Sequence, residues 1–306
     1  NNIPMSYFIR EDPLTGDRCI VATSRSRRPH LTKNLSAEEP FQCPFCSGSE
    51  ALTPREVMRV DGGSGWIIRV IPNKFPAIPH MHEVVVDSPS HEDDLDTIPH
   101  LDRLLWTYRE RMTRYYNVEG VKYVAVFRNR GREAGASIPH PHSQVLALPF
   151  YPARFLKEKE RYTRENRDLL GDFLEKEISL QERVLKVSKS FCVITAYAPV
   201  TSYEMWVVPK RRITSFVFEK ELEELAEVIR DTVSVLKGLL GEGVPYNLTI
   251  QSAPPWEEDY RYYVRILPRV SVFGGFEMET QNVIVSVAPE DAARELRSVM
   301  YARRTE

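Results

Sequence analysis

Two histidines at alternate positions mark the segment of this chain with the clearest potential for chemistry. His140 and His142 follow a loop rich in small residues, and Gln144 continues the alternation. On an extended backbone these three side chains project to the same face of a strand. Pro141 faces away and cannot donate to a strand ladder, which indicates a strand start or a sheet edge. The cluster favours histidine chemistry over an isolated surface or core histidine, and all seven histidines lie at or before position 142.

A pair of cysteines supplies the second candidate site. Cys43 and Cys46 are separated by two residues, which is the spacing of one arm of a zinc knuckle. The same spacing also serves redox chemistry or no function, and the residues alone leave this open. Cys19 and Cys192 lie singly in apolar runs, so no disulfide framework is predicted and a reducing compartment is expected.

Composition excludes several classes of protein. The chain has 306 residues, enough for one large domain or two ordinary ones, and its 42% of hydrophobic residues excludes a disordered chain. Lys and Arg number 41 against 43 Asp and Glu, so the basic excess of a nucleic-acid binder is missing. No apolar run approaches the roughly 18 residues of a membrane span, and no signal peptide is visible. We expect a cytoplasmic protein whose partners include neither nucleic acid nor membrane.

Hydrophobic periodicity predicts the elements that must position these residues. In the first half it predicts a helix over 101–116, and a long charged helix is expected over 153–184 with a possible break. Short runs rich in Val, Ile and aromatic residues predict strands at 17–22, 56–60, 65–71, 82–87, 121–128 and 143–149.

The second half repeats this order at an offset of about 120 residues, so that 84–86 falls against 206–208. It has strand-like runs at 190–197, 204–208, 246–251, 262–267 and 282–287, an amphipathic helix over 219–240, and a final helix that opens at Pro289. Because short turns rather than crossover helices join the strands, we predict an α+β fold in which an antiparallel sheet with packed helices is used twice. The two units are placed at residues 1–175 and 176–306.

The order of the motifs resembles the histidine-triad superfamily and, within it, the galactose-1-phosphate uridylyltransferase family. The resemblance covers nearly the whole chain. It rests on the His-Pro-His-Ser-Gln run and the Asn-x-Gly and Gly-x-Ser pairs before it, and on segments 10–16, 25–29, 73–77 and 275–281. It implies two tandem histidine-triad-like units and a homodimer. The Phe273-Gly-Gly-Phe run after 266–269 is also similar to nucleotide-sugar phosphorylases, which leaves the substrate open.

For the reaction, the resemblance implies a histidine nucleophile. His142 would attack the α-phosphorus of UDP-glucose, glucose 1-phosphate would leave, and galactose 1-phosphate would then attack the nucleotidyl-histidine in a ping-pong sequence. Neutral imidazole is available at pH 7, because its unperturbed pKa is about 6.5. The resemblance also implies that the backbone carbonyl of His140 holds the other ring nitrogen, and that Ser137 and Gln144 donate to phosphate oxygens.

A set of substrate-binding residues follows from the same resemblance. They are Arg25, Arg28, Asn73, Lys74, Phe75, Asn129, Gly131, Gly135, Ser137, Gln144, Phe276, Glu277 and Gln281. The arginines would supply positive charge for phosphate, although a solvated surface face stays open for them. Phe75 is either a stacking wall or part of the core. The segment around Glu277 would bind sugar and reach the nucleophile of a partner subunit.

The resemblance further implies one structural zinc per chain, held by Cys43, Cys46, His91 and His140. Such a closed site would brace His140 and, through it, the nucleophile. The remaining histidines, His80, His82 and His100, match no family position, and we interpret them as surface or neighbouring residues.

Some members of the family hold a second metal in the C-terminal half. The three histidine positions of that site read Gln251, Arg261 and Tyr263 in this chain, although Glu158 or Glu160 could match the acidic ligand. A permanently cationic arginine repels a metal, so no second metal is expected.

Three functions compete at this point. The leading hypothesis is exchange of UMP between UDP-glucose and galactose 1-phosphate. The alternative is a nucleotide-sugar (ADP-glucose-type) or dinucleotide phosphorylase that uses the same His142 with phosphate as acceptor. A non-enzymatic nucleotide-binding protein is the third, and the intact His-Pro-His-Ser-Gln run speaks against it.

Overall fold

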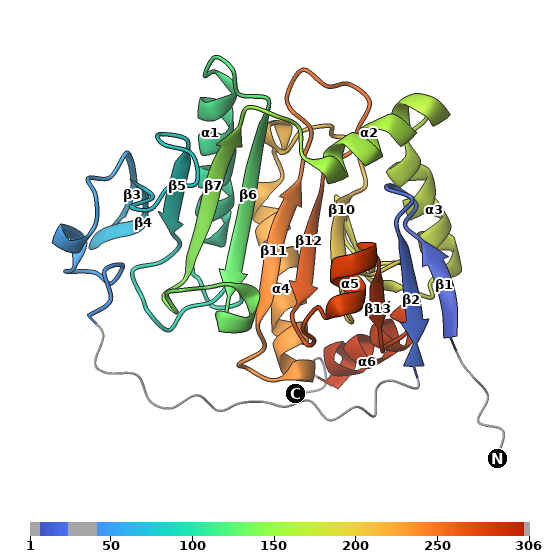
Figure 1. The fold of residues 1–306 in the computed structure, drawn as a ribbon. Coiled ribbons are helices and arrows are strands. Elements are labelled where there is room, and N and C mark those ends of the chain that lie inside the picture. The colour runs from blue at the N-terminus through green and yellow to red at the C-terminus, as the bar shows by residue number, and fades with distance from the viewer. Residues whose placement is uncertain (1–6, 24–41, 303–306) are drawn as a thin grey trace.

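The computed structural model describes residues 7–23 and 42–302, so the predicted phosphate-binding residues Arg25 and Arg28 lie outside the described residues. Among the described residues, a ten-stranded sheet with the order β3-β4-β5-β7-β6-β11-β12-β10-β9-β8 forms the centre (Figure 1). Every neighbouring pair in this sheet is antiparallel. The strands are β3 (Met58–Gly62), β4 (Gly65–Pro72), β5 (His82–Val86), β6 (Tyr123–Arg130), β7 (His142–Leu148), β8 (Val184–Val187), β9 (Phe191–Thr195), β10 (Met205–Pro209), β11 (Tyr246–Gln251) and β12 (Tyr263–Pro268).

The two halves of the sheet follow the same path. In each half three strands precede a long helix and two strands follow it, and the last two strands are exchanged in the spatial order. The halves meet where β6 pairs with β11, with Val126 opposite Ile250. The predicted α+β fold of two like units is confirmed, and the two units share one sheet. The boundary between residues 175 and 176 remains a prediction.

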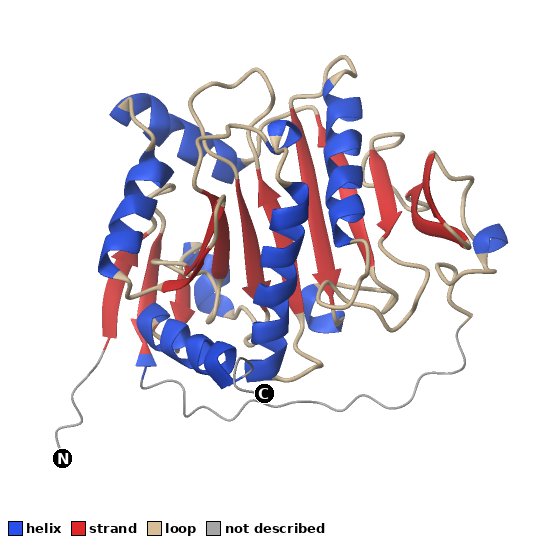
Figure 2. Cartoon of the chain, turned by 180° about the vertical axis from the view of Figure 1, so that it is seen from behind, coloured by secondary structure: helices blue, strands red, loops and turns tan. Residues whose placement is uncertain are grey.

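Helices cover both faces of the sheet. On one face α1 (Leu101–Tyr116) and α4 (Leu222–Leu240) lie side by side, and α6 (Pro289–Ala302) packs against α4 (Figure 2). The other face carries α2 (Ala153–Glu165) and α3 (Leu169–Leu180) over the strands of the second half.

The bounds of α1 agree with the prediction because its apolar residues recur every three or four positions. Leu101, Leu104, Leu105, Tyr108 and Met112 are all buried in the main core. Burying one large apolar side chain contributes about 1.5–3 kcal/mol, so this stripe holds the helix on the sheet behind β6 and β7. α4 begins at 222 rather than at 219, because a 3-10 turn (Phe216–Phe218) precedes it.

The helix expected over 153–184 consists of two helices and the start of a strand. α2 ends at Glu165, and its C-cap Asn166 is left-handed with a φ of 49°. Asp168 is the N-cap of α3 and accepts the N–H of Gly171 at 3.1 Å. α3 ends before Gln181, which has a φ of 58°. A left-handed residue commonly ends a helix, so the expected break is confirmed and a second one follows it.

Sequence analysis missed β8, a short strand near the N-terminus and a short helix near the C-terminus. β1 (Tyr7–Glu11) pairs with β2 (Arg18–Ala22), and β13 (Val283–Val285) adds to β2 in parallel, which makes a three-stranded sheet. α5 (Gly275–Thr280) is a short helix in the segment predicted to bind sugar. In the described part of the chain, no helix is both long and apolar enough to span a membrane.

Candidate functional site

β7 brings His142 and Gln144 to one face of the sheet. His142 is its first residue and pairs with Val86 of β5, and Gln144 pairs with Val84. The N–H of Asp87 donates to the carbonyl of Pro141 at 3.0 Å and so holds the start of the strand. This is the shared face that the alternation predicted.

One ring nitrogen of His142 is hydrogen-bonded to the backbone, and the other is available to react. Nδ1 lies 2.8 Å from the backbone carbonyl oxygen of His140. A carbonyl can only accept, so Nδ1 carries the hydrogen and Nε2 keeps a lone pair. Burial lowers the pKa of His142 below its usual value. The ring is therefore neutral near pH 7, which is the nucleophilic form.

A cavity of about 670 Å³ lies beside His142. This volume falls within the range of about 300–1,000 Å³ that is usual for small-molecule sites. The cavity is lined by strands β4, β5 and β7, by the loop that follows β4, by the segment 42–54 and by the loop before β7. The lining residues are Gln42, Pro44, Phe45, Leu52, Thr53, Pro54, Ile71, Pro72, Asn73, Lys74, Phe75, His82, Val84, Ser137, Ile138, His142 and Gln144.

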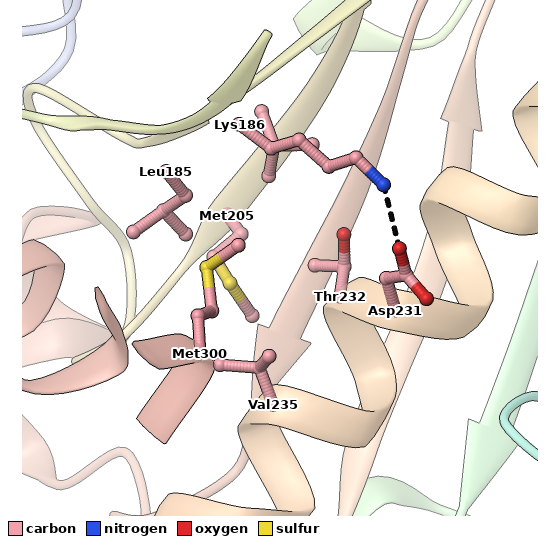
Figure 3. Close-up of a pocket in the computed structure, with 8 residues that line it drawn as sticks. Leu185, Lys186, Met205, Asp231, Thr232, Val235 and Met300 are labelled. Carbon is pink, nitrogen blue, oxygen red and sulfur yellow. Dashed lines mark hydrogen bonds and ion pairs between the residues drawn. The ribbon is translucent and has the colours of Figure 1, made fainter. Parts of the chain in front are cut away.

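A second hollow lies between β8, β10 and α4 (Figure 3). It measures about 10 Å³ and is lined mainly by apolar side chains such as Met205 and Met300, with the ion pair of Lys186 and Asp231 at its edge. A space of this size holds about one water molecule. It cannot hold a nucleotide sugar.

Six of the predicted site residues line the cavity together. Asn73, Lys74, Phe75, Ser137, His142 and Gln144 come from three separate segments and meet there. The ring of Phe75 is 82% exposed, so the core interpretation of this residue is wrong. The stacking role stays a prediction.

The loop between β6 and β7 contacts the second half of the molecule, and the predicted role of its residues in binding substrate stays a prediction. Gly131 has a φ of 86°, and a Cβ atom there would lie 2.8 Å from the side chain of Pro245. Asn129 accepts a hydrogen bond from the Asn247 amide at 2.8 Å, and Gly135 lies against Asn129. Asn129 and Gly131 thus contact the second half, and neither they nor Gly135 are among the described residues that line the cavity.

The predicted sugar-binding residues Phe276, Glu277 and Gln281 also lie away from the cavity. They belong to α5 and its C-cap, and α5 lies beside β13 (Figure 1). The carboxylate of Glu277 accepts the N–H of Gly274 at 2.8 Å and caps this helix. Within one chain the structure does not bring this segment to His142.

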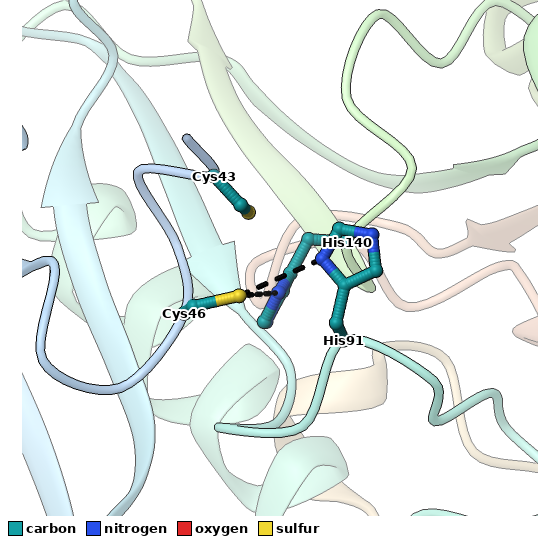
Figure 4. A group of neighbouring side chains, drawn as sticks. All are labelled: Cys43, Cys46, His91 and His140. Atoms are coloured by element: carbon teal, nitrogen blue, oxygen red, sulfur yellow. Dashed lines mark hydrogen bonds between the residues drawn. The ribbon is translucent and has the colours of Figure 1, made fainter. Parts of the chain in front are cut away.

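Four potential metal ligands converge at the start of the strand that carries His142 (Figure 4). They are Cys43, Cys46, His91 and His140, and their ligand atoms all lie within 4.8 Å of one another. Nδ1 of His91 lies 3.6 Å from Sγ of Cys46, and Nδ1 of His140 lies 3.5 Å from it. Tetrahedral zinc, at about 2.3 Å from sulfur and about 2.05 Å from nitrogen, separates the two ligand atoms by about 3.5–3.6 Å. The donor set and its spacing fit zinc.

His140 connects the cluster to His142. Its Nε2 lies 2.7 Å from the carbonyl oxygen of Ser88, so Nε2 carries the hydrogen and the lone pair of Nδ1 faces the thiols. Burial lowers the pKa of His140 to about 4, which keeps the ring neutral and able to ligate. The ring of His140 thus belongs to the cluster while its backbone carbonyl fixes the tautomer of His142.

A buried polar network behind β7 was missed by sequence analysis. Arg128 pairs with Asp87 at 2.9 Å, and the Ser143 hydroxyl donates to the same carboxylate at 2.8 Å. Arg128 also pairs with Asp94 at 3.1 Å, and Tyr246 of β11 donates to Asp94. The network joins the strand of His142 to the second half of the sheet. Its sequence signal is a pair of charged residues, Asp87 and Arg128, at the ends of apolar runs.

His82 was placed among surface or neighbouring residues, and the structure puts it in the cavity wall. The side chain is 8% exposed, and Nε2 lies 2.8 Å from Oε1 of Gln144. The two residues come from adjacent strands, where His82 pairs with Leu146 and so is a diagonal neighbour of Gln144.

In the second half, the positions at which the resemblance places a second metal form other contacts. Arg261 pairs with Asp168 and donates to the carbonyl of Pro209 at 2.7 Å. Tyr263 donates to the buried carboxylate of Glu158 at 2.6 Å, and Tyr260 donates to the same group. The polar groups of these side chains are therefore already hydrogen-bonded within the protein.

We therefore expect metal analysis of the purified protein to find one zinc per chain and no second metal. The guanidinium of Arg261 is permanently charged and repels a cation at this place. Inductively coupled plasma mass spectrometry on protein prepared without chelator measures the ratio. Stoichiometric iron, or two zinc ions per chain, would contradict the expectation.

Comparison with known proteins identifies the relatives of this chain. The family DUF4921, a domain of unknown function, matches residues 90–306, and the N-terminal domain of DUF4931, also of unknown function, matches residues 25–150. An ADP-glucose phosphorylase of Arabidopsis thaliana is 30% identical over 331 aligned residues, which span 95% of this chain and 92% of that protein. This chain belongs to the galactose-1-phosphate uridylyltransferase family, within the histidine-triad superfamily.

Other members of the family agree in sequence and fold. A galactose-1-phosphate uridylyltransferase of Thermotoga maritima is 27% identical over 327 residues, covering 94% of this chain and 97% of that protein. The crystal structure of an ADP-glucose phosphorylase from Arabidopsis thaliana with bound ADP-glucose superposes with a TM-score of 0.84 at 27% identity. That match covers 95% of this chain and 98% of the other. The resemblance identified from the sequence is confirmed at the level of the family.

Proposed function

We propose that this protein transfers a nucleoside monophosphate from a nucleotide sugar to an acceptor through a covalent bond to His142. The observation that carries the proposal is the hydrogen bond from Nδ1 of His142 to the His140 carbonyl, at 2.8 Å. It leaves Nε2 as the nitrogen with a lone pair on a ring that lines the cavity. A neutral, oriented imidazole at the wall of a nucleotide-sized cavity suits nucleophilic catalysis.

The reaction then has two displacements. In the first, Nε2 of His142 attacks the α-phosphorus, the bond from that phosphorus to the bridging oxygen breaks, and the sugar 1-phosphate leaves with the electron pair. In the second, a phosphate oxygen of the acceptor attacks the same phosphorus, and the nitrogen–phosphorus bond breaks to restore the free imidazole. The histidine divides one difficult transfer into two easier ones.

We propose that the other predicted site residues stabilise charge and position the substrate. Ser137 and Gln144 donate hydrogen bonds to the oxygens of the transferring phosphate. Asn73, Lys74 and Phe75 hold the nucleoside, and Arg25 and Arg28 supply further charge for the diphosphate. When bound at Cys43, Cys46, His91 and His140, zinc braces the backbone that orients His142.

Two pairs of substrates are the candidates for this site. ADP-glucose with inorganic phosphate is supported by the Arabidopsis thaliana relative, which is 30% identical to this chain, against 27% for the Thermotoga maritima enzyme. UDP-glucose with galactose 1-phosphate is supported by the Thermotoga maritima relative. We propose ADP-glucose phosphorolysis as the first activity to test and UMP exchange as the second.

The deciding experiment traps the intermediate. The protein is incubated with ADP-glucose or with UDP-glucose and no acceptor, and its intact mass is measured. We expect an acid-labile gain of one AMP or one UMP per chain, and the base that gives the faster gain identifies the donor. Adding phosphate or galactose 1-phosphate should remove the adduct and identify the acceptor. Intersecting lines in two-substrate kinetics, together with no adduct, would contradict the proposal.

The sugar end of the site is proposed to come from a second copy of the chain. Phe276, Glu277 and Gln281 lie away from His142 within one chain, although Val272 and Met278 in the same segment are 87% and 77% exposed. Several large exposed apolar side chains in one segment favour a surface that contacts a partner. A homodimer in which this segment approaches the partner's cavity would complete the site.

Replacing Glu277 with alanine should raise the KM for the sugar substrate or lower turnover, by roughly tenfold, because a carboxylate that accepts from sugar hydroxyls is lost. Steady-state kinetics measures the effect, and zinc content should not change. Since Glu277 also caps α5, Glu277→Gln is the control, because its amide oxygen can still accept the N–H of Gly274. Unchanged kinetics in Glu277→Ala would exclude the binding role.

A further inference from the structure

The two ring nitrogens of His82 have different partners, and neither partner is solvent. Nδ1 lies 3.0 Å from the backbone nitrogen of Ala77, and Nε2 lies 2.8 Å from Oε1 of Gln144. The residue begins β5, lines the cavity and is 8% exposed. A buried ring held at both nitrogens has one orientation.

The contact with Ala77 decides the tautomer of this ring. A backbone N–H can only donate, so Nδ1 of His82 must accept and carries no hydrogen. In the neutral ring the hydrogen is then on Nε2, which donates to Oε1 of Gln144. A proton on Nδ1 would set two donors against each other at 3.0 Å. The backbone of Ala77 therefore acts through His82 on the side chain of Gln144.

Two side-chain amides beside His142 are oriented by this arrangement. Oε1 of Gln144 accepts from His82, so the NH2 group is the end left for the cavity. Oδ1 of Asn73 accepts the N–H of Phe75 at 2.8 Å, so this amide also has its NH2 group left over. The 3.4 Å contact between Nδ2 of Asn73 and Nε2 of His82 joins two donors and is not a hydrogen bond. Paired NH2 groups suit a ligand rich in acceptor oxygens, such as a phosphate.

We propose that His82 is a positioning residue that holds the amide of Gln144 with its NH2 group toward the phosphate that His142 attacks. The inference rests on the proposed function. The two ends of an amide are nearly equal in size, so packing alone does not choose between them. Without a donor at His82, the amide can turn and present Oε1, whose partial negative charge repels a phosphate oxygen. His82 thereby keeps Gln144 in the orientation that stabilises the developing charge.

A double-mutant cycle tests whether His82 acts through Gln144. The variants are His82→Phe, which keeps an aromatic ring without its nitrogens, Gln144→Ala, and the double variant. Each is measured by the single-turnover rate of adduct formation with ADP-glucose and UDP-glucose, and by calorimetric affinity for ADP and UDP. In the wild-type background we expect His82→Phe to lower the rate of adduct formation and the nucleotide affinity by roughly tenfold. In the Gln144→Ala background the same replacement should change both quantities by no more than about twofold.

A rescue variant separates positioning from mere structure. His82→Gln carries an N–H that can donate to Oε1 of Gln144, and it should recover most of the loss seen in His82→Phe. Zinc content and melting temperature serve as controls for the fold. The inference would be overturned if His82→Phe caused equal losses in the presence and absence of Gln144. It would also be overturned if His82→Gln were no better than His82→Phe in rate and affinity.

The two readouts keep this inference apart from the proposed function. If the wild-type protein binds ADP or UDP but forms no adduct with either nucleotide sugar, the proposed function fails, and coupling between His82 and Gln144 in the binding constants still decides the positioning role. A wild-type protein that binds neither nucleotide and forms no adduct would overturn both.

Discussion

Replacing His142 with alanine should lower nucleotidyl transfer by about 10⁴-fold or more, because the variant has no nitrogen that can bond to phosphorus. The variant would keep only the rate enhancement that substrate binding in the cavity provides. Turnover is measured with each nucleotide sugar and its acceptor, and the intact mass is measured after incubation with the donor alone. We expect no adduct in the variant.

His100→Ala is the matched control for this prediction. His100 is exposed, precedes α1 and makes no side-chain capping bond, so its loss should leave both turnover and adduct unchanged. A His142→Ala variant that still gains the mass of a nucleotide would place the nucleophile elsewhere. Turnover within about tenfold of the wild type would show that no covalent step at this residue is needed.

Replacing Cys43 with serine should remove the zinc and lower the melting temperature by roughly 5–10 °C. A closed metal site contributes folding energy directly, and a few kcal/mol of lost stability moves the midpoint of a chain of this size by several degrees. The four ligands come from three separate segments, so zinc ties the segment 42–54 to the start of β7. Zinc content is measured by mass spectrometry and unfolding by calorimetry. Turnover should fall less than in His142→Ala.

Cys192→Ser is the control for the loss of a buried thiol. Cys192 lies in the core under α2 and α3, so this variant should lose stability through poorer packing while it keeps one zinc per chain. The expectation for Cys43 would be wrong if Cys43→Ser retained stoichiometric zinc. Zinc in less than about a third of wild-type chains would show that the cluster is not a structural metal site.

Several features were predictable from the sequence because their causes are local. The spacing of Leu101, Leu104, Leu105 and Tyr108 sets α1, since one turn of helix repeats within four residues. The alternation of His142 and Gln144 puts both side chains on one face of β7, because the side chains of a strand point to the same face at every second residue. The spacing of the cysteines and the order of motifs along the chain were enough to identify the family.

The sequence by itself determined most of the helices and strands and which residue types gather near the reactive histidine. Only the tertiary structure decided how those segments pair. The junction of β6 and β11, the contact of His82 with Gln144, and the position of α5 away from the cavity all join or separate residues far apart in the chain. The hydrogen bonds and packing that fix such partners act across space, and the residues on either side of each segment carry no local signal for them.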